Sequence, residues 1–210
     1  MKNYIQKAIK FADYTKLIDD LLTDNKTTGT NQSDAMVGYG KLNRQRMLRL
    51  EKTIVTSLEL KAAAWCVERP MIWLTITEGW CGDAAQNIPV IEKIAAESDK
   101  IETRYILRDE NLDLMDQYLT NGARSIPKLI AVDAETFELL GTWGARPLAA
   151  QKLFAEMKAG GVEKAGILEE MQRWYNNDKG RSLQREFESL LSVWGAYSAY
   201  PAAAAAFSKA

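Results

Sequence analysis

The strongest pattern in this sequence is a buried strand that leads directly into a helix. Residues 71–78, MIWLTITE, are apolar and rich in β-branched side chains, which is typical of a strand covered on both faces of an open sheet. Residues 79–98 follow without a separating loop and place Ile88, Ile91 and Ile94 on one helical face. This succession favours an α/β fold.

The order of the remaining segments predicts a mixed central sheet flanked by helices. Further strands are expected at 101–109, 125–133 and 137–143. Helices are expected at 112–120, 147–158, 162–176 and 181–195. The order from residue 71 to residue 158 is therefore βαβαββα, in which helical connections suit parallel or distant strands and the last two strands can form a hairpin.

The part of the chain before the first strand is predicted to be largely helical. Apolar side chains recur at helical spacing within residues 1–25, which favours one or two short helices. Residues 25–40 are polar and contain glycines, so they are expected to form a long loop. Residues 42–66 predict one long amphipathic helix, which ends before Pro70 because proline disfavours helix in the residue that precedes it.

Composition excludes several kinds of catalytic and metal site. The 210 residues include no histidine, which removes Ser-His-Asp and Cys-His catalysis and histidine-bound zinc. The two cysteines, Cys66 and Cys81, are too few for a four-cysteine metal site. We therefore expect no metal and no cofactor. Cys66 is expected to be a small buried hydrophobe on a helix.

Charge and hydropathy indicate neither a nucleic-acid partner nor a membrane partner. The formal net charge is -1 and the sequence pI is about 5.7, so no phosphate-binding face is expected. No tract approaches the roughly 20 apolar residues that span a bilayer. The chain begins with charges where a signal peptide needs its apolar segment, so we expect a cytoplasmic protein of bacterial type. Four basic residues are expected on the solvated side of one helix: Lys41, Arg44, Arg46 and Arg49.

Cys81 stands at the junction of the predicted strand and the helix that follows it. Free backbone N–H groups and the helix dipole at such a position can lower the pKa of a thiol. Asp83 acts in the opposite direction, because a nearby carboxylate disfavours a second negative charge. Trp80 and Gly82 are expected to leave the sulfur accessible beside a flat apolar surface. The sign of the net pKa shift stays open at this point.

The surroundings of Cys81 resemble the active site of the thioredoxin family. The Trp-Cys-Gly-Pro-Cys site of that family is matched at Trp80, Cys81 and Gly82. Pro89 lies eight residues after Cys81. Pro127, the proline of the SIP sequence, follows Cys81 by 46 positions (127 − 81). The resemblance implies a thioredoxin-like fold.

The same resemblance implies a domain division and further site residues. In the family, an isoleucine and a cis-proline pack beside the nucleophile, as Ile126 and Pro127 would here, and a glycine matched by Gly144 lines the substrate groove. A thioredoxin-like domain is expected at residues 55–160. A helical N-terminal extension, residues 1–54, is expected to pack on this core, and residues 161–210 are expected to form a helical C-terminal extension. A narrower resemblance is to thioredoxin-like proteins of Bacteroidetes-type bacteria that carry a helical N-terminal extension and a WCGDA site.

Three departures from the family pattern concern the release of a mixed disulfide. Asp83 stands where the family has proline, Ala84 where it has the resolving cysteine, and Thr75 where it has a buried acid. Cys66 cannot substitute, because the intervening strand spans about 26 Å and a disulfide needs Cα atoms within about 7 Å. A mixed disulfide at Cys81 would therefore persist until an outside thiol attacked it.

Two functional hypotheses follow from these departures. The first is monothiol thiol-disulfide exchange with Cys81 as nucleophile and a protein or a low-molecular-weight thiol or disulfide as partner. The second is a redox-inactive module that binds a peptide or protein in the same groove. A Cys81 pKa near 8.5 or above favours binding, and one below about 7 favours chemistry. The candidate substrate-binding residues are Trp80, Gly82, Asp83, Arg124, Ile126, Pro127 and Gly144.

Three local features each have two possible roles, one structural and one functional. Trp80 can pack against the fold or contact a substrate. Arg124 is more readily a solvated side chain than a ligand for a substrate carboxylate. The 24–38 loop can be a simple connection or a lid over the Cys81 end of the sheet.

Overall fold

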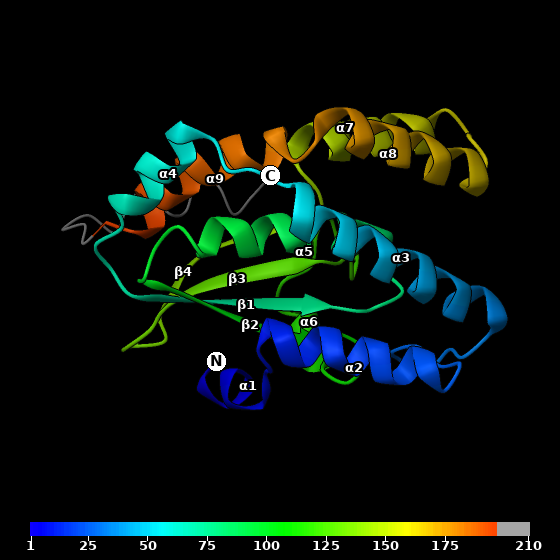
Figure 1. The fold of residues 1–210 in the computed structure, drawn as a ribbon, viewed down its shortest axis with the longest axis horizontal. Helices are drawn as coiled ribbons and strands as arrows, with labels where there is room; N and C mark the ends of the chain where they lie inside the picture. The colour runs from blue at the N-terminus through cyan, green and yellow to red at the C-terminus, as the bar shows by residue number, and fades with distance from the viewer. Residues whose placement is uncertain (197–210) are drawn as a thin grey trace.

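A four-stranded mixed sheet lies at the centre of the chain in this computed structural model, which describes residues 1–196 (Figure 1). The strand order is β2-β1-β3-β4, with β1 parallel to β2 and antiparallel to β3, and β3 antiparallel to β4. The strands are β1 (Met71–Thr77), β2 (Ile101–Leu107), β3 (Lys128–Asp133) and β4 (Leu139–Gly144). The predicted α/β architecture is confirmed.

Strand β1 runs through the middle of the sheet and separates two layers of side chains. All seven of its residues are buried, as its apolar run predicts. Because side chains alternate along a strand, Met71 and Trp73 join one apolar cluster, while Ile72 and Leu74 join the other. The central position of β1 fixes where Cys81, a few residues beyond its end, lies in the fold.

Helices cover both faces of this sheet (Figure 1). The helices α1 and α2 lie on one face, and α5 lies on the other beneath α4 and α9. The helices are α1 (Lys2–Lys7), α2 (Phe11–Thr23), α3 (Asp34–Thr53), α4 (Leu58–Trp65), α5 (Gly82–Ala95), α6 (Leu112–Met115), α7 (Leu148–Ala159), α8 (Lys164–Asp178) and α9 (Arg181–Trp194). The expected extra helices before and after the segment that forms the sheet are confirmed.

The predicted loop at 25–40 and the predicted helix at 42–66 are both wrong in part. Helix α3 already begins at Asp34, where an acidic first turn complements the helix dipole. It ends at Thr53, within a run of β-branched residues, TIVT, that disfavours helix. A separate helix, α4, then begins after Ser57, whose Oγ accepts a hydrogen bond from the Leu60 N–H at 3.1 Å.

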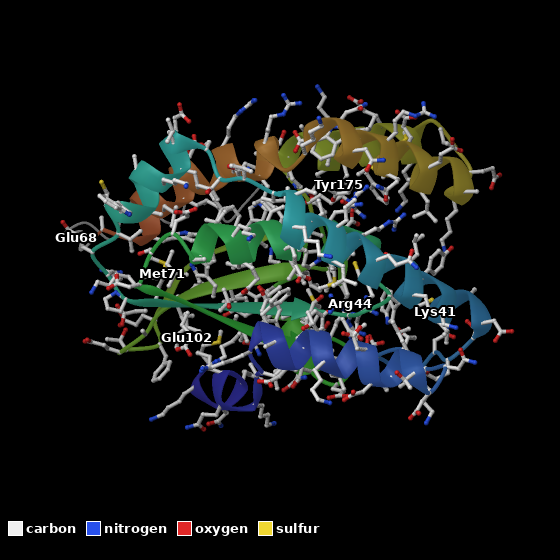
Figure 2. The ribbon with its side chains drawn as sticks, viewed as in Figure 1. Lys41, Arg44, Glu68, Met71, Glu102 and Tyr175 are labelled. Carbon is white, nitrogen blue, oxygen red and sulfur yellow. The ribbon has the colours of Figure 1, made fainter. Side chains whose placement is uncertain are left out.

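The prediction that Cys66 is buried is also wrong, because its side chain is exposed. Leu60 and Ala64 form the inner face of α4, so Trp65 and Cys66, the next two residues, turn away from the core. Both cysteines are free. Cys66 precedes β1 at the end of the sheet where Figure 2 labels Met71, whereas Cys81 follows the opposite end of that strand.

Both terminal extensions contact the sheet or its helices. Between α1 and α2, Ile9 exchanges two backbone hydrogen bonds with Tyr105 of the edge strand β2, at 2.9 and 2.8 Å. On the other side, Phe187 of α9 packs against the rings of Trp73 and Trp143. The division at residues 54 and 160 stays a prediction, and the last part of the predicted C-terminal extension, 197–210, lies outside the described residues.

All four basic residues of α3 were expected on a solvated face, but the structure places only two of them there. Lys41 and Arg49 are exposed, but Arg44 lies between α2 and α3, where it pairs with Asp19 at 2.8 Å (Figure 2). Arg46 is partly buried near the end of β1. In residues 1–196, no helix combines the length and apolar character required to cross a bilayer.

Candidate functional site

The Cys81 sulfur lies in a buried position between β1 and α5. Cys81 is the N-cap of α5, and its Sγ accepts a hydrogen bond from the Ala84 N–H at 3.4 Å. The thiol donates to the carbonyl of Ile126 at 3.2 Å. Only 8% of the residue is exposed, so the expectation of an accessible sulfur is wrong. The loop that carries Ile126 covers the thiol, which neighbouring sequence alone does not reveal.

This environment raises the pKa of the Cys81 thiol to about 12. Burial is the main cause, because it disfavours the charged form, and the Asp83 carboxylate adds to it. The Ala84 N–H and the Arg146 guanidinium act in the opposite direction. The direction of the Cys81 pKa shift, which the sequence left open, is therefore upward, and the thiol is protonated at neutral pH.

Asp83 is held by two residues from the C-terminal part of the chain. Arg146 pairs with one carboxylate oxygen at 2.6 Å, and the Tyr175 hydroxyl donates to the other at 2.8 Å. Tyr175 lies on α8 (Figure 2), and the next residue, Asn176, accepts a hydrogen bond from Arg49 of α3 at 3.4 Å. Burial raises the pKa of Asp83, while the contacts with Arg146 and Tyr175 lower it. Asp83 thus ties α8 to the start of α5.

Two further side chains, one on α5 and one on α7, complete this cluster. Asn87 donates a hydrogen bond to the Tyr175 hydroxyl at 3.1 Å and another to the Asp83 carbonyl at 2.8 Å. The Arg146 guanidinium stacks 4.0 Å from the centre of the Phe154 ring. Sequence reasoning missed Arg146 and Tyr175, because no local motif marks a side chain that reaches the site from another helix or loop.

Trp80 is stacked against a charged side chain on the other side of the site. The Arg108 guanidinium lies 4.8 Å from the centre of its ring and pairs with Asp109 at 2.8 Å. The Asp109 backbone N–H donates a hydrogen bond to the carboxylate of Glu78. Glu78 is fully buried, and this burial raises its pKa. Trp80 thus has a packing role, and a contact with a substrate stays a prediction.

The loop before α3 packs against the end of β1. Thr28 accepts a hydrogen bond from the Gly79 N–H through its Oγ1 at 2.8 Å. Gln32 ties the loop together, since its side chain bonds to the backbone of both Thr27 and Gly29. The loop therefore lies at the Cys81 end of the sheet, and its action as a lid stays a prediction.

The loop that covers Cys81 has the features that the resemblance implied. The Ile126-Pro127 peptide bond is cis. Gly144 has a φ of 124°, and a Cβ there would lie 2.2 Å from the Pro127 carbonyl oxygen, so only glycine fits. Arg124 is exposed and makes two hydrogen bonds to Asp116, at 2.6 and 2.7 Å. This agrees with its solvated reading.

A pocket of about 770 Å³ opens beside Cys81. Its walls come from α3, from the start of α5 and from α8, with Phe154 of α7 and Arg146 beside them. Six of the predicted site residues line it: Trp80, Cys81, Gly82, Asp83, Arg124 and Ile126. Pro127 and Gly144 support the Ile126 loop without lining the pocket. Among residues 1–196, no three acidic, cysteine or histidine side chains lie close enough together to hold a metal ion.

The sheet order, the cysteine before α5 and the cis-proline beside it define a thioredoxin-like protein. The chain belongs to the thioredoxin family, since the family profile described as Thioredoxin matches residues 29–158. The matched range includes α3 as well as the sheet. No curated protein matches the chain.

Two solved structures share this fold over most of their length. One is a protein of unknown function from Pseudomonas aeruginosa, with 19% identity and a TM-score of 0.57, covering 90% of this chain and 93% of the other. The second is an HIV epitope scaffold, with 20% identity and a TM-score of 0.53, covering 88% of this chain and 97% of the other. At these identities the similarity shows the fold alone. The narrower Bacteroidetes-type resemblance stays a prediction.

Proposed function

We propose that this protein binds a small molecule in the pocket beside Cys81 and that the thiol stays protonated there. The pocket itself is the observation that carries this proposal. Its volume, about 770 Å³, lies within the range of about 300 to 1,000 Å³ that is common for small-molecule sites.

The walls of the pocket support a small ligand over an extended peptide. Helix α3 forms one wall and helix α8 another, so segments that flank the sheet border the thioredoxin-like groove on two sides. The Ile126 carbonyl accepts a hydrogen bond from the Cys81 thiol at one edge of the pocket. A compact ligand fits this arrangement without displacing either helix.

The state of Cys81 favours binding over chemistry. A nucleophilic cysteine needs a populated thiolate, and such residues are usually accessible and have a lowered pKa. Here the pKa is raised to about 12 and the sulfur is buried. The neutral thiol acts as a hydrogen-bonding part of the pocket wall.

Monothiol exchange is the second candidate, and it is favoured by one observation: Cys81 lines the pocket beside Ile126. In that reaction the thiolate attacks one sulfur of a disulfide, forms a mixed disulfide and releases the other sulfur as a thiolate. An outside thiol must then attack the mixed disulfide, because Ala84 provides no resolving sulfur. The partner would be a low-molecular-weight disulfide or a protein disulfide.

The pH dependence of Cys81 alkylation separates these candidates. In a Cys66→Ser variant Cys81 is the remaining thiol, and its rate of reaction with iodoacetamide can be followed by mass spectrometry. With a pKa near 12 against an ordinary value of 9.0, the folded protein at pH 8 should react about a thousandfold more slowly than the same chain in denaturant. The rate should still be rising at pH 10.

A matched Cys81→Ser variant, which keeps the exposed Cys66, should be alkylated readily in the folded state. A Cys81 rate that levels off below pH 8 would overturn the protonated-thiol proposal. Rapid formation of a glutathione mixed disulfide at Cys81 from glutathione disulfide, at neutral pH, would establish the exchange reaction in its place.

A further inference from the structure

Arg46 is a partly buried cation that lines the pocket without a carboxylate beside it in the described part of the chain. Its Nη1 donates a hydrogen bond to the Asn43 side-chain oxygen at 3.0 Å. The other three arginines of the pocket each have an acidic partner: Arg108 with Asp109, Arg124 with Asp116, and Arg146 with Asp83. Among residues 1–196, no carboxylate lies within ion-pair distance of Arg46.

The position of Arg46 is electrostatically unfavourable in the free protein. A Cβ at Gly82, the first residue of α5, would lie 3.7 Å from the Arg46 Nη1, so the guanidinium lies over the positive end of that helix. Burial lowers the pKa of Arg46, and the charge of Arg49 lowers it further. An anion in the pocket would relieve both effects, because it would pair with the guanidinium and complement the helix dipole.

The rim of the same pocket exposes large apolar side chains. Tyr39 and Leu42 of α3 are 38% and 43% exposed, and Leu168 of α8 is 45% exposed. Apolar side chains gathered around a hollow commonly mark a binding site. The ligand is therefore expected to carry an apolar portion as well as a charge.

We propose that the pocket takes a small amphipathic oxyanion, such as an organic carboxylate, whose charged group pairs with Arg46. The apolar part of the ligand lies against the side chains of α3 and α8. This assignment rests on the proposed function, since it names the class of molecule that the pocket binds.

The neighbours of Arg46 hold it ready for such a ligand. Asn43 is almost fully buried, and its amide donates a hydrogen bond to the Gly79 carbonyl at 3.1 Å. The side-chain oxygen of Asn43 is thereby oriented toward the Arg46 Nη1, and the rest of the guanidinium fork is left for a bidentate contact. Little side-chain entropy then needs to be lost on binding.

A pair of dyes tests this assignment. The fluorescent probe 8-anilinonaphthalene-1-sulfonate carries an oxyanion, and N-phenyl-1-naphthylamine has the same ring system without the charge. In the 210-residue chain, Arg46→Gln should weaken binding of the sulfonate dye about tenfold, since a charged hydrogen-bonding partner is lost. Binding of the neutral dye should stay unchanged.

Arg49→Gln is the matched control, because Arg49 is an exposed arginine of the same helix that does not line the pocket. It should weaken binding of the sulfonate dye far less than Arg46→Gln does, because its charge acts on Arg46 only from outside the pocket, and it should leave binding of the neutral dye unchanged. Arg46→Gln should also not lower the free energy of unfolding, as measured in urea, because it removes an unfavourable charge.

Each contrary result has a separate meaning. Equal losses of the sulfonate dye in Arg46→Gln and Arg49→Gln, or no loss in either, would overturn the Arg46 assignment while leaving a binding pocket. Equal losses of both dyes in Arg46→Gln would show that the substitution disturbs the pocket, and would also overturn it. If the wild-type protein binds neither dye, the proposed function fails and the assignment fails with it.

Discussion

At Cys81, the start of a helix and a nearby carboxylate act on the thiol in opposite directions. Both effects follow from the local sequence, because the Ala84 N–H and Asp83 are fixed by their distance along the chain. Burial outweighs both of them. The Ile126 loop contributes to that burial, and the motif around Cys81 does not report it. A thioredoxin-like motif therefore does not by itself predict a reactive thiol.

Position 144 must be glycine because the backbone of the Ile126 loop packs directly against it. Gly144→Ala should lower the free energy of unfolding by about 3 kcal/mol or more, because overpacking costs about 1 to 3 kcal/mol and backbone strain adds a similar amount. Its Cβ would overlap the Pro127 carbonyl oxygen. Urea denaturation followed by circular dichroism measures the change.

Gly122 provides the control, since it also has a positive φ but has open space where a Cβ would lie. Gly122→Ala should cost only the backbone term, about 1 to 2 kcal/mol. Similar losses for the two substitutions would contradict the steric explanation for Gly144.

At the scale of secondary structure, α3 is the element that turns a surface groove into a pocket. It packs along α5 and lines the pocket with Tyr39, Leu42 and Arg46. Its attachment depends on Asn43, whose buried amide contacts the backbone of Gly79 just after β1. The helix is thus joined to the segment that positions Cys81.

Asn43→Ala should lower the free energy of unfolding by about 2 kcal/mol, because it leaves the buried Gly79 carbonyl without this donor. It should also weaken binding of the sulfonate dye, since Arg46 loses the contact that orients it. Urea denaturation and dye titration measure the two effects.

Gln45→Ala, at an exposed position of α3, introduces the same residue into the same helix. It should change stability by no more than about 0.5 kcal/mol. If Asn43→Ala destabilises the protein no more than Gln45→Ala does, Asn43 does not anchor the helix.

At the scale of the whole molecule, the terminal extensions share the apolar core of the sheet. Leu50 of α3, Leu60 of α4 and Phe187 of α9 belong to one buried cluster with Trp73 of β1. On the opposite face, the ring of Tyr14 on α2 stacks on the ring of Tyr105 on β2. We therefore expect the extensions and the sheet to unfold together.

Phe187→Ala should lower the free energy of unfolding by about 3 to 5 kcal/mol, because it opens a cavity between three tryptophan rings. Unfolding should remain a single transition, with tryptophan fluorescence and far-UV circular dichroism giving the same midpoint. Leu148→Ala, at an exposed position of α7, should change stability little. Two separate transitions in the wild-type protein would show that α9 is an independent unit.

The fold was largely predictable because its signals are local and periodic. The apolar run of β1, the helical spacing of α5 and the turn after β3 each lie within a few neighbouring residues. The errors arose where local signals that interrupt a helix were overlooked or where contacts from distant segments add to them. The break between α3 and α4 is one case, since the side chain of Gln184 on α9 accepts from the Ser57 N–H and donates to the Val55 carbonyl.

The candidate site was predictable in its centre and not in its walls. Residues 80–83 and the Ile126-Pro127 pair follow from a motif with regular spacing, and they meet as expected. Arg46, by contrast, looked like a solvated charge, and Tyr175 gave no signal at all. Both reach the pocket from helices outside the motif.

Sequence alone established an α/β thioredoxin-like fold, one cysteine at the start of a helix and the lack of a resolving partner, because these depend on residue identity and short-range order. Tertiary structure decided that the cysteine is buried and protonated, and that a pocket with Arg46 in its wall and apolar side chains at its rim lies beside it. The physical reason is that solvent exposure and charge pairing depend on which distant side chains pack around a group.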